Sequence, residues 1–332
     1  MEITFDVHGN QKQKQCVEAW LDDEIFDIVY GGSKGGAKSY TLVSLIFGDA
    51  FCYPGTFYFI ARKKLNDLRK FTIPSIYEVF GHWQVPKHYY TYNGQDNYFE
   101  LYNGSRVYLF EAAYYPSDPL YERFGSIQMT RGAIEEAGEI DEAAKNNLAA
   151  SIGRWLNDKY NLVPKLLQTC NPSKNYLYRQ YYKPFKEGTL EPHKRFIQAL
   201  PTDNKMLSKG YIENLIRVLN PNQKERLLKG NWEYDDDPAV LMDYEKIVDI
   251  FTNKHVDKGS KYITADIARL GGDRIVIIEW EGFRGRIYWY RKERLTETAN
   301  RIEALRSRMK IGKSSIVVDE DGMGGGIVDF YG

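Results

Sequence analysis

The sequence predicts an α/β protein whose first domain has a mainly parallel sheet and is followed by a second, smaller α/β domain. Three observations support this. A glycine-rich loop at residues 31–39 joins an apolar strand to an apolar helix. Short apolar runs then alternate with helical stretches to about residue 231, which is typical of parallel strands with crossover helices. A second group of apolar strands begins near residue 261.

The periodicity of the first part predicts six strands and five helices. The strands are expected at residues 25–30, 56–61, 98–102, 106–111, 126–134 and 164–169, and the helices at 11–21, 38–51, 64–80, 141–150 and 208–217. Residues 231–245 contain an acidic triplet and Pro238, and they break this rhythm as a linker does.

The last part of the chain predicts the order strand, strand, strand, helix, strand. These strands are expected at residues 261–268, 274–280, 286–291 and 315–319, with the helix at 295–310. This order matches the first part of an RNase H-like fold. A further helix is expected after the glycines at residues 322–326.

The overall composition is that of a globular protein. The 332 residues are 43% hydrophobic and 27% charged, with a formal net charge of zero. No run approaches the roughly 18 apolar residues that a membrane span needs, so no membrane partner is expected. The cysteines, Cys16, Cys52 and Cys170, are far apart, which argues against a paired-cysteine metal site.

The loop at residues 31–39 has the features of a phosphate-binding loop. Backbone N–H groups of a glycine-rich turn and a helix N-terminus attract phosphate, and a lysine adds a mobile cation. The Walker A pattern fits with one change, because Ala37 replaces the last glycine. Its methyl group fits if φ stays negative. The residues expected to bind ATP are Gly31, Gly32, Ser33, Lys34, Gly35, Gly36, Ala37, Lys38 and Ser39.

Two acids follow an apolar run at Ile134, as in a Walker B strand. One acid of such a pair serves the metal and the next activates the attacking water. We therefore expect Glu135 to hold Mg²⁺ together with Ser39, and Glu136 to act as general base. On their own, the two acids would also fit the cap of a surface helix.

Asn171 lies two residues beyond the strand predicted at 164–169. Ligands of open α/β sheets bind at the carboxyl ends of the strands, so Asn171 is well placed to sense the γ-phosphate. The pair Asn171-Pro172 alone is mostly a turn signal.

The order of these motifs resembles the large subunit of a tailed-bacteriophage terminase, the motor and nuclease that packages viral DNA. The family's loop carries a cation that Lys34 matches, and Ala37 resembles many members at its position. The segment with Gln11, Gln13 and Gln15 is similar to the family's adenine-contacting motif. The resemblance does not show which of the three makes the contact, and we take Gln13 as the ATP contact. Further similar segments are Phe59–Lys63, Arg123–Gly125, Thr169–Pro172 and Gly230–Trp232.

The resemblance implies an ATP-hydrolysing motor that translocates double-stranded DNA. Lys34 would stabilise charge in the transition state, and Asn171 would couple loss of the γ-phosphate to domain movement. Glu135 departs from the family, where aspartate is commoner. The implied working form is a homo-oligomeric ring on the portal protein of a procapsid, with a small terminase subunit as partner. It would lie in the host cytoplasm and dock transiently on the procapsid.

Acidic residues in the last part of the chain resemble the first two acidic motifs of terminase nucleases. Asp266 and Asp319 end two predicted strands, and carboxylates brought together in this way hold the two metals of many nucleases. We expect them to bind Mg²⁺ or Mn²⁺, with Asp273 as a further ligand. The family's third acidic cluster lies beyond the elements found here, so we expect a C-terminally incomplete nuclease that cleaves DNA poorly or not at all.

These assignments divide the chain into an ATPase domain (1–231), a linker (232–245) and the N-terminal part of an RNase H-like nuclease (246–332). Two other functions stay open. A helicase or repair translocase would separate strands and has no use for two acid-ended strands. A nucleic-acid-binding structural protein with an inactive P-loop would tolerate Lys38→Ala. Basic, aromatic-rich segments at 174–195 and 284–313 suit a nucleic-acid backbone and equally an ordinary solvated surface.

Overall fold

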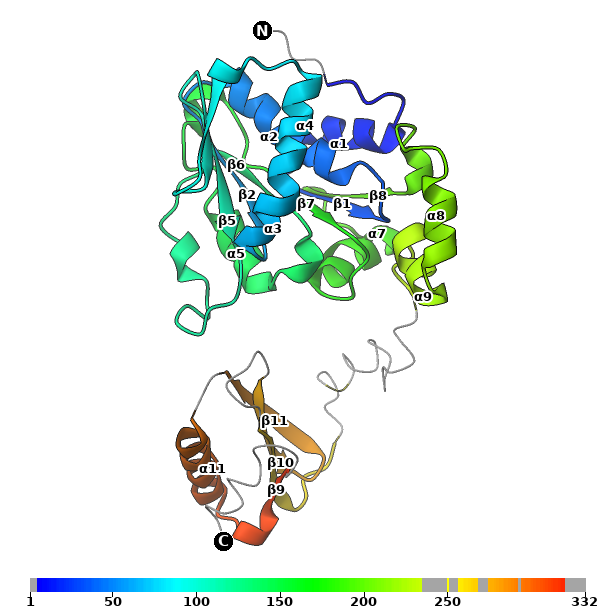
Figure 1. The fold of residues 1–332 in the computed structure, drawn as a ribbon. Coiled ribbons are helices and arrows are strands. Elements are labelled where there is room, and N and C mark those ends of the chain that lie inside the picture. The colour runs from blue at the N-terminus through cyan, green and yellow to red at the C-terminus, as the bar shows by residue number, and fades with distance from the viewer. Residues whose placement is uncertain (1–4, 235–249, 251–255, 268–273, 292–293, 320–332) are drawn as a thin grey trace. The chain divides into compact units, whose positions relative to one another are not determined.

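A computed structural model describes residues 5–234, 250, 256–267, 274–291 and 294–319 (Figure 1). Its contacts divide the chain into two compact units, Met1–Leu241 and Met242–Gly332. Most of the predicted linker, Asp273 and the helix expected after residue 322 lie outside the described residues. Within the described residues, no helix is long and apolar enough to cross a membrane.

The first unit is built on an eight-stranded sheet in the order β3-β4-β5-β2-β6-β7-β1-β8. The strands from β5 to β8 in this order pair in parallel, and β3 and β4 pair antiparallel at one edge. The strands are β1 (Asp27–Gly32), β2 (Phe57–Arg62), β3 (Tyr90–Asn93), β4 (Tyr98–Leu101), β5 (Arg106–Glu111), β6 (Arg131–Ile134), β7 (Leu166–Cys170) and β8 (Lys194–Ala199).

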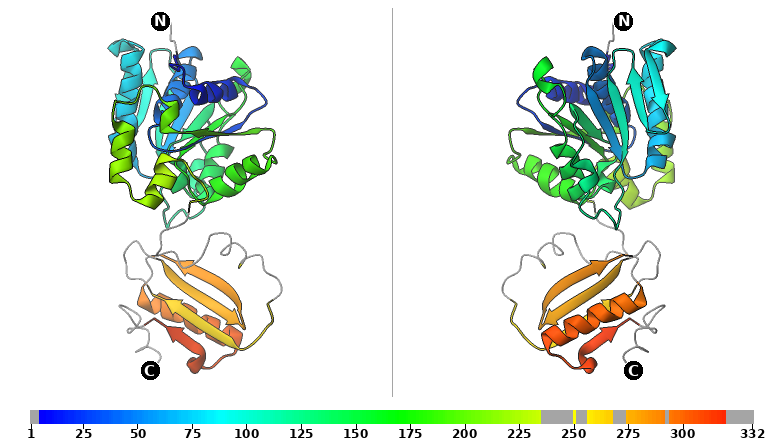
Figure 2. Two further views of the ribbon diagram at one scale, coloured as in Figure 1. Left: turned by 90° about the vertical axis from the view of Figure 1, so that its right-hand side faces the viewer. Right: turned by 90° about the vertical axis from the view of Figure 1, so that its left-hand side faces the viewer.

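Helices cover both faces of this sheet (Figures 1 and 2). On one face lie α1 (Gln11–Leu21), α2 (Lys38–Cys52) and α4 (Ile73–His82), and on the other lie α5 (Glu142–Ala150) and α7 (Lys183–Glu187). The other helices of this unit are α3 (Leu65–Asp67), α6 (Asn157–Tyr160), α8 (Tyr211–Val218) and α9 (Pro221–Gln223), and π-helical turns occur at Leu68–Thr72, Tyr178–Tyr182 and Lys224–Leu228.

Local sequence explains the two elements that lead into the glycine-rich loop. α1 begins after Asn10, whose side chain accepts hydrogen bonds from the backbone of Lys12 and Gln13, as an N-cap residue does. β1 has a neighbouring strand on each side, and Ile28 and Val29 are fully buried. A continuous apolar run suits a parallel strand that is covered on both faces.

The strand order places β7 between β1 and β6. Gly31 of β1 pairs with Cys170 of β7, and Gln168 of β7 pairs with Ile134 of β6. Because the three strands run parallel, their carboxyl ends meet at one edge of the sheet. The segments that follow them are therefore brought together although they are far apart in the sequence.

The predicted alternation is confirmed, but several element predictions are wrong. β3 and β8 were not expected, because β3 has polar residues at alternate positions and β8 begins with the basic pair Lys194-Arg195. The strand predicted at 126–134 begins only at Arg131; before it, Met129 forms an isolated bridge with Ile152. The helix predicted at 64–80 is instead a series of α3, a π-helical turn and α4.

Trp232 is part of the packed first unit and not of a linker as predicted. Its side chain is fully buried. The indole ring stacks on Tyr182 with 5.2 Å between centroids and contacts the edge of Phe196 at 5.4 Å. Aromatic burial of this extent outweighs the turn-forming character of the neighbouring residues.

The second unit has a four-stranded sheet in the order β11-β10-β9-β12. Its elements are β9 (Lys261–Asp266), β10 (Ile275–Glu281), β11 (Arg284–Tyr290), α11 (Leu295–Met309) and β12 (Ile316–Val318). β12 pairs in parallel with β9, and the other pairs are antiparallel. One face of the sheet packs against α11 (Figure 2) through a core that includes Ile263, Ile277 and Ile302.

Candidate active site

The glycine-rich loop is closely packed against the strand beside it. Gly32 has φ 141°, and a Cβ atom there would lie 2.1 Å from the carbonyl oxygen of Ala199. Gly35 has φ 80°, and its Cβ would lie 2.9 Å from the ring of Tyr211. Side chains at these two positions would clash or strain the backbone, so the loop needs these glycines.

The backbone of Ala37 corrects the expectation of a negative φ. Its φ is 60° and its ψ is 25°, in the left-handed region. Ala37 is the N-cap residue of α2 and makes no side-chain capping bond. The N–H groups of the first helical turn are therefore not capped by this side chain, which leaves them for an anion.

Ala37→Gly is expected to raise the free energy of unfolding by up to about 1 kcal/mol. A left-handed alanine costs roughly 1–2 kcal/mol, and the greater freedom of glycine in the unfolded chain offsets part of this gain. Urea denaturation measures the change. Ala149→Gly, within α5, is the control and is expected to lose about 1 kcal/mol. A loss in both variants would contradict the strain at Ala37.

Lys38 lies buried at the start of α2 with its amine turned into the loop. The Nζ atom donates to the carbonyl oxygen of Ser33 and lies 3.4 Å from Oδ1 of Asn171. Burial lowers the pKa of Lys38, and the nearby negative charge of Glu136 opposes this. Lys34 is exposed and Ser39 is half-buried.

Glu136 and Asn171 face each other across the ends of β6 and β7. Nδ2 of Asn171 donates to Oε2 of Glu136 at 3.1 Å. Burial raises the pKa of the Glu136 carboxyl, while the Lys38 and Arg62 cations oppose this rise. Glu136 has φ 52° and ψ 49°, a left-handed backbone that an acidic residue adopts only where its surroundings hold it.

Glu135 is placed differently from its neighbour. Its buried carboxylate accepts a hydrogen bond from Thr72 and forms an ion pair with Arg62 at 3.4 Å. These contacts do not test a metal role for Glu135, which stays a prediction. Arg62 ends an apolar strand, a signal that sequence analysis can use. The sequence gives no such signal for Thr72, because a π-helical turn places its side chain against Glu135.

The three glutamines at the start of α1 differ in burial. Gln13 is buried and donates from Nε2 to Oγ1 of Thr41 at 2.9 Å. Thr41 lies in the first turn of α2 and also donates to the carbonyl oxygen of Ala37. Gln11 and Gln15 are exposed. Gln13 is thus the glutamine attached to the helix that follows the loop.

Arg123 is held by its own segment. Its guanidinium pairs with Asp118 at 2.6 Å and donates to the carbonyl oxygen of Ala113 at 2.6 Å. The rings of Tyr115 and Phe124 lie 4.6 Å from it. In this arrangement the guanidinium stabilises the loop before β6.

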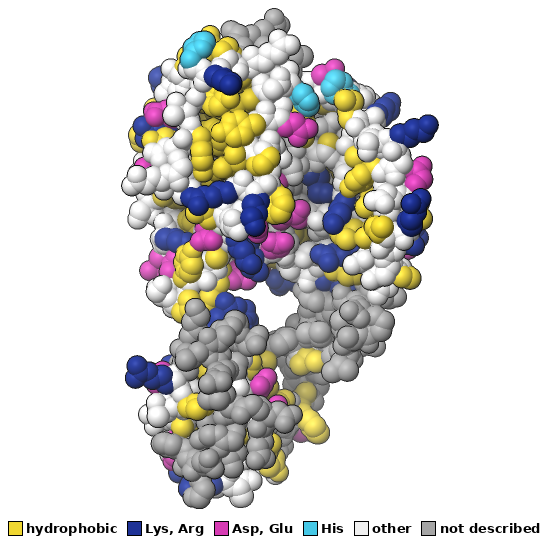
Figure 3. All heavy atoms as spheres, viewed as in Figure 1, with side chains coloured by type: hydrophobic (Ala, Val, Ile, Leu, Met, Phe, Trp, Pro, Cys, Tyr) yellow, Lys and Arg dark blue, Asp and Glu magenta, His cyan; other side chains and the backbone are white. Residues whose placement is uncertain are grey.

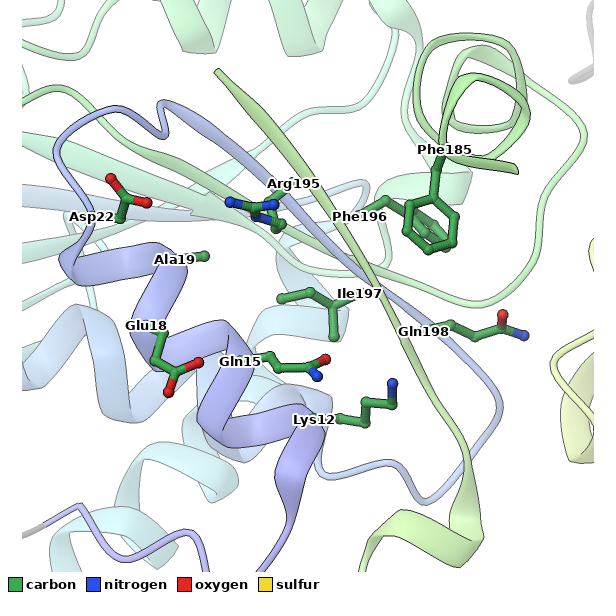
Figure 4. Close-up of a pocket in the computed structure, with 10 residues that line it drawn as sticks. All are labelled: Lys12, Gln15, Glu18, Ala19, Asp22, Phe185, Arg195, Phe196, Ile197 and Gln198. Carbon is green, nitrogen blue, oxygen red and sulfur yellow. The ribbon is translucent and has the colours of Figure 1, made fainter. Parts of the chain in front are cut away.

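A cavity of about 650 Å³ lies between α1 and the edge strand β8 (Figure 4). Its lining includes charges of both signs, among them Lys12, Glu18 and Arg195, and none of Lys38, Glu136 or Asn171. The face of the molecule seen in Figure 3 likewise has Lys and Arg side chains dispersed among Asp and Glu. Neither feature marks the nucleotide site.

Asp266 and Asp319 lie side by side at the ends of β9 and β12. Val318 pairs with Ala265, and the backbone N–H of Asp319 donates to the carbonyl oxygen of Ala265 at 3.0 Å. Both acids line a pocket of about 260 Å³. In the described part of the chain, no group of three or more His, Cys, Asp or Glu residues is placed to hold a metal.

Residues 24–229, more than half of the chain, match the phage terminase large subunit family. The chain belongs to this family. A comparison of this terminase with the curated proteins gave no match. The family match confirms the family predicted from sequence, and the mostly parallel sheet confirms the predicted α/β fold.

Solved terminase structures share the fold of this terminase large subunit. The large terminase of the thermophilic bacteriophage D6E is 16% identical, with a TM-score of 0.54, and the match covers 96% of this chain and 79% of that one. Its complex with ATP-γ-S matches over the same shares, with a TM-score of 0.52. The large terminase of bacteriophage HK97 is 9% identical, with a TM-score of 0.52 over 96% of this chain and 70% of that one.

Proposed function

We propose that this terminase large subunit hydrolyses ATP to translocate double-stranded DNA, and that its second unit belongs to the nuclease that cuts the DNA. The observation that carries the proposal is the series of contacts from Lys38 to Asn171 and on to Glu136. The Lys38 amine, the Asn171 amide and the Glu136 carboxylate form a row of contacts beside the glycine-rich loop.

The glycine-rich loop and α2 supply the binding groups. Backbone N–H groups of residues 31–39 and the amine of Lys38 bind the β- and γ-phosphates. Lys38 must leave the carbonyl oxygen of Ser33 to do so. Gln13 binds the adenine and Lys34 stabilises charge that develops in the transition state. Ser39 and Glu135 would hold Mg²⁺, which would neutralise phosphate charge when bound.

Glu136 is the general base of the proposed reaction. Its carboxylate accepts a proton from the attacking water, and the amide of Asn171 keeps it oriented. Since Asn171 also contacts Lys38, its side chain is placed to respond when the γ-phosphate leaves. That response couples hydrolysis to domain movement.

The proposed working assembly is a homo-oligomeric ring on the portal protein of a procapsid. The ring acts in the host cytoplasm with the small terminase subunit and double-stranded DNA as partners. The family assignment supports this proposal, and the ATP-γ-S complex of the D6E enzyme supports ATP as the nucleotide.

The second unit is proposed to bind the nuclease metals. Asp266 and Asp319 offer two hard oxygen ligands at neighbouring strand ends, which suit Mg²⁺ or Mn²⁺. Asp273 is proposed as a further ligand. The two metals would assist cleavage of the phosphodiester when bound.

ATP hydrolysis by the full chain tests the motor function. Wild-type protein is expected to turn over MgATP faster when double-stranded DNA is added. Lys38→Ala is expected to lose at least a hundredfold in turnover because a preorganised cation at the phosphates is removed. The control is Lys87→Ala, an exposed lysine outside the site, with wild-type turnover.

Retained turnover in Lys38→Ala would contradict the assigned site. Tight ATP binding without turnover, with and without DNA, would contradict the motor function. Separation of a forked duplex by the wild-type protein would favour a helicase instead.

Metal binding tests the second unit. Titration calorimetry with Mn²⁺ in the absence of nucleotide is expected to show a site that weakens by roughly tenfold or more in Asp266→Asn and in Asp319→Asn, because each removes a charged ligand. Asp257→Asn is the control, since this exposed acid lies outside the pocket. Equal affinities in all four proteins would contradict the assignment.

A further inference from the structure

The segment after β7 contacts the two residues that follow Glu136. Nδ2 of Asn175 donates to the carbonyl oxygen of Gly138 at 3.1 Å, and the hydroxyl of Ser173 lies 3.4 Å from the same oxygen. The hydroxyl of Tyr176 lies 3.4 Å from the carbonyl oxygen of Ala137. The turn that carries Glu136 is thus attached to the segment that carries Asn171.

Both attaching side chains are themselves oriented. Oδ1 of Asn175 accepts from the backbone N–H of Leu177 at 2.9 Å, which points Nδ2 at the turn. Tyr176 is only 2% exposed, and the one hydrogen of its hydroxyl is shared between Oε1 of Gln168 at 2.9 Å and the carbonyl oxygen of Ala137 at 3.4 Å.

Gln168 belongs to a buried polar network in the centre of the unit. Its Nε2 donates to Asp27 at 2.7 Å and to the hydroxyl of Tyr181 at 3.1 Å. Asp27 pairs with Lys145 at 2.9 Å. A buried network whose members are satisfied by one another is rigid, so Tyr176 is fixed to the interior of the sheet.

The close approach of the two segments is visible at Gly138. A Cβ atom there would lie 3.0 Å from Cβ of Ser173. The turn also contains the left-handed backbone of Glu136, which is costly unless surrounding contacts maintain it. Asn175 and Tyr176 contact the carbonyl oxygens of Gly138 and Ala137, the two residues after Glu136. These contacts are placed to maintain the left-handed backbone of Glu136.

We propose that Asn175 and Tyr176 are positioning residues, which hold the turn after β6 so that the Glu136 carboxylate stays on Asn171. The inference rests on the proposed ATPase function, and it adds two residues to which no sequence motif assigns a role in the site. Neither touches the nucleotide; they act through Glu136.

Kinetics of MgATP hydrolysis by the full chain test this role. Tyr176→Phe removes one hydroxyl and Asn175→Ala removes one amide. Each is expected to lower kcat by about tenfold with little change in KM, because small displacements of a catalytic group cost rate more than binding. Tyr178→Phe and Asn147→Ala are matched controls, since their side chains bond to Glu233 and Leu120 and not to the turn.

A double-mutant cycle separates positioning from a general structural effect. If Asn175 acts through the contact between Asn171 and Glu136, Asn171→Ala with Asn175→Ala has about the kcat of Asn171→Ala alone. Multiplicative losses in the double variant would overturn the proposal. So would a loss of kcat that parallels a lowered melting temperature in Tyr176→Phe.

The same assays distinguish the inference from the function on which it rests. If Lys38→Ala and Glu136→Gln abolish hydrolysis while Tyr176→Phe and Asn175→Ala match the wild type, only the positioning role is overturned. If the wild type does not hydrolyse ATP, both are overturned.

Discussion

Glu136→Gln is expected to lower kcat for ATP hydrolysis by roughly 10²- to 10⁴-fold, the usual contribution of a general base. The amide keeps the size of the side chain and cannot accept the proton of the attacking water. ATP affinity is expected to stay near that of the wild type, because the loop and Lys38 bind the phosphates. Single-turnover hydrolysis and equilibrium binding of a fluorescent ATP analogue measure the two effects separately.

The pH dependence of kcat/KM gives a second signature of Glu136. Burial raises the pKa of its carboxyl above the ordinary 4.5. Only the ionised form is a base, so kcat/KM should rise with pH through a pKa above 4.5. This limb should be absent from the residual activity of Glu136→Gln.

The free energy of unfolding should fall with rising pH over the range in which kcat/KM rises. A carboxyl whose pKa is raised by folding costs stability once pH exceeds its unfolded value, because the folded state resists its charge. Glu136→Gln is therefore expected to be at least as stable as the wild type at neutral pH. Glu139→Gln, an exposed acid three residues away, is the control with unchanged kcat. A stable Glu136→Gln with wild-type kcat would contradict the assignment of the base.

Gly32→Ala is expected to have the largest effect on the loop. The added Cβ would meet the backbone carbonyl oxygen of Ala199 at 2.1 Å, at a φ of 141°. Backbone cannot rotate away as a flexible side chain does, so the variant should lose roughly 1–3 kcal/mol or more. Displacement of the loop should also abolish ATP binding. Chemical denaturation and nucleotide titration measure both.

Gly48→Ala is the matched control for this variant. Gly48 lies within α2, and a Cβ atom added there would meet nothing within 4 Å. Alanine there should raise stability by about 1 kcal/mol and leave ATP binding intact. If Gly32→Ala is as stable as Gly48→Ala and binds ATP equally well, the close packing of the loop against β8 is wrong.

The glycine-rich loop and the parallel sheet were predictable because they depend on local pattern. Glycine spacing, an apolar strand before it and an apolar helix after it are all visible in sequence. β8 was missed because Lys194 and Arg195 open it, and an edge strand does not need a continuous apolar run. The φ of Ala37 was mispredicted, because alanine prefers a negative φ and the packing of the loop imposes a positive one.

The candidate site was predictable only in part. Lys38, Glu136 and Asn171 follow strands whose ends must meet in a parallel sheet, and the structure brings them into contact. Thr72 and Tyr176 could not be found in this way. Their side chains reach the site through a π-helical turn and a buried network, which leave no periodic pattern in the sequence.

The position of β1 between β7 and β8 has a consequence for synthesis of the chain. β1 is made early, yet both of its neighbours lie more than a hundred residues further on, at Leu166–Cys170 and Lys194–Ala199. Contacts of such long sequence separation form slowly. One edge of β1 has no partner until Cys170 has been made and the other has none until Ala199 has been made, and unpaired edges invite association with other chains. The strand order therefore makes this interval of synthesis the one in which β1 is most exposed to association with other chains.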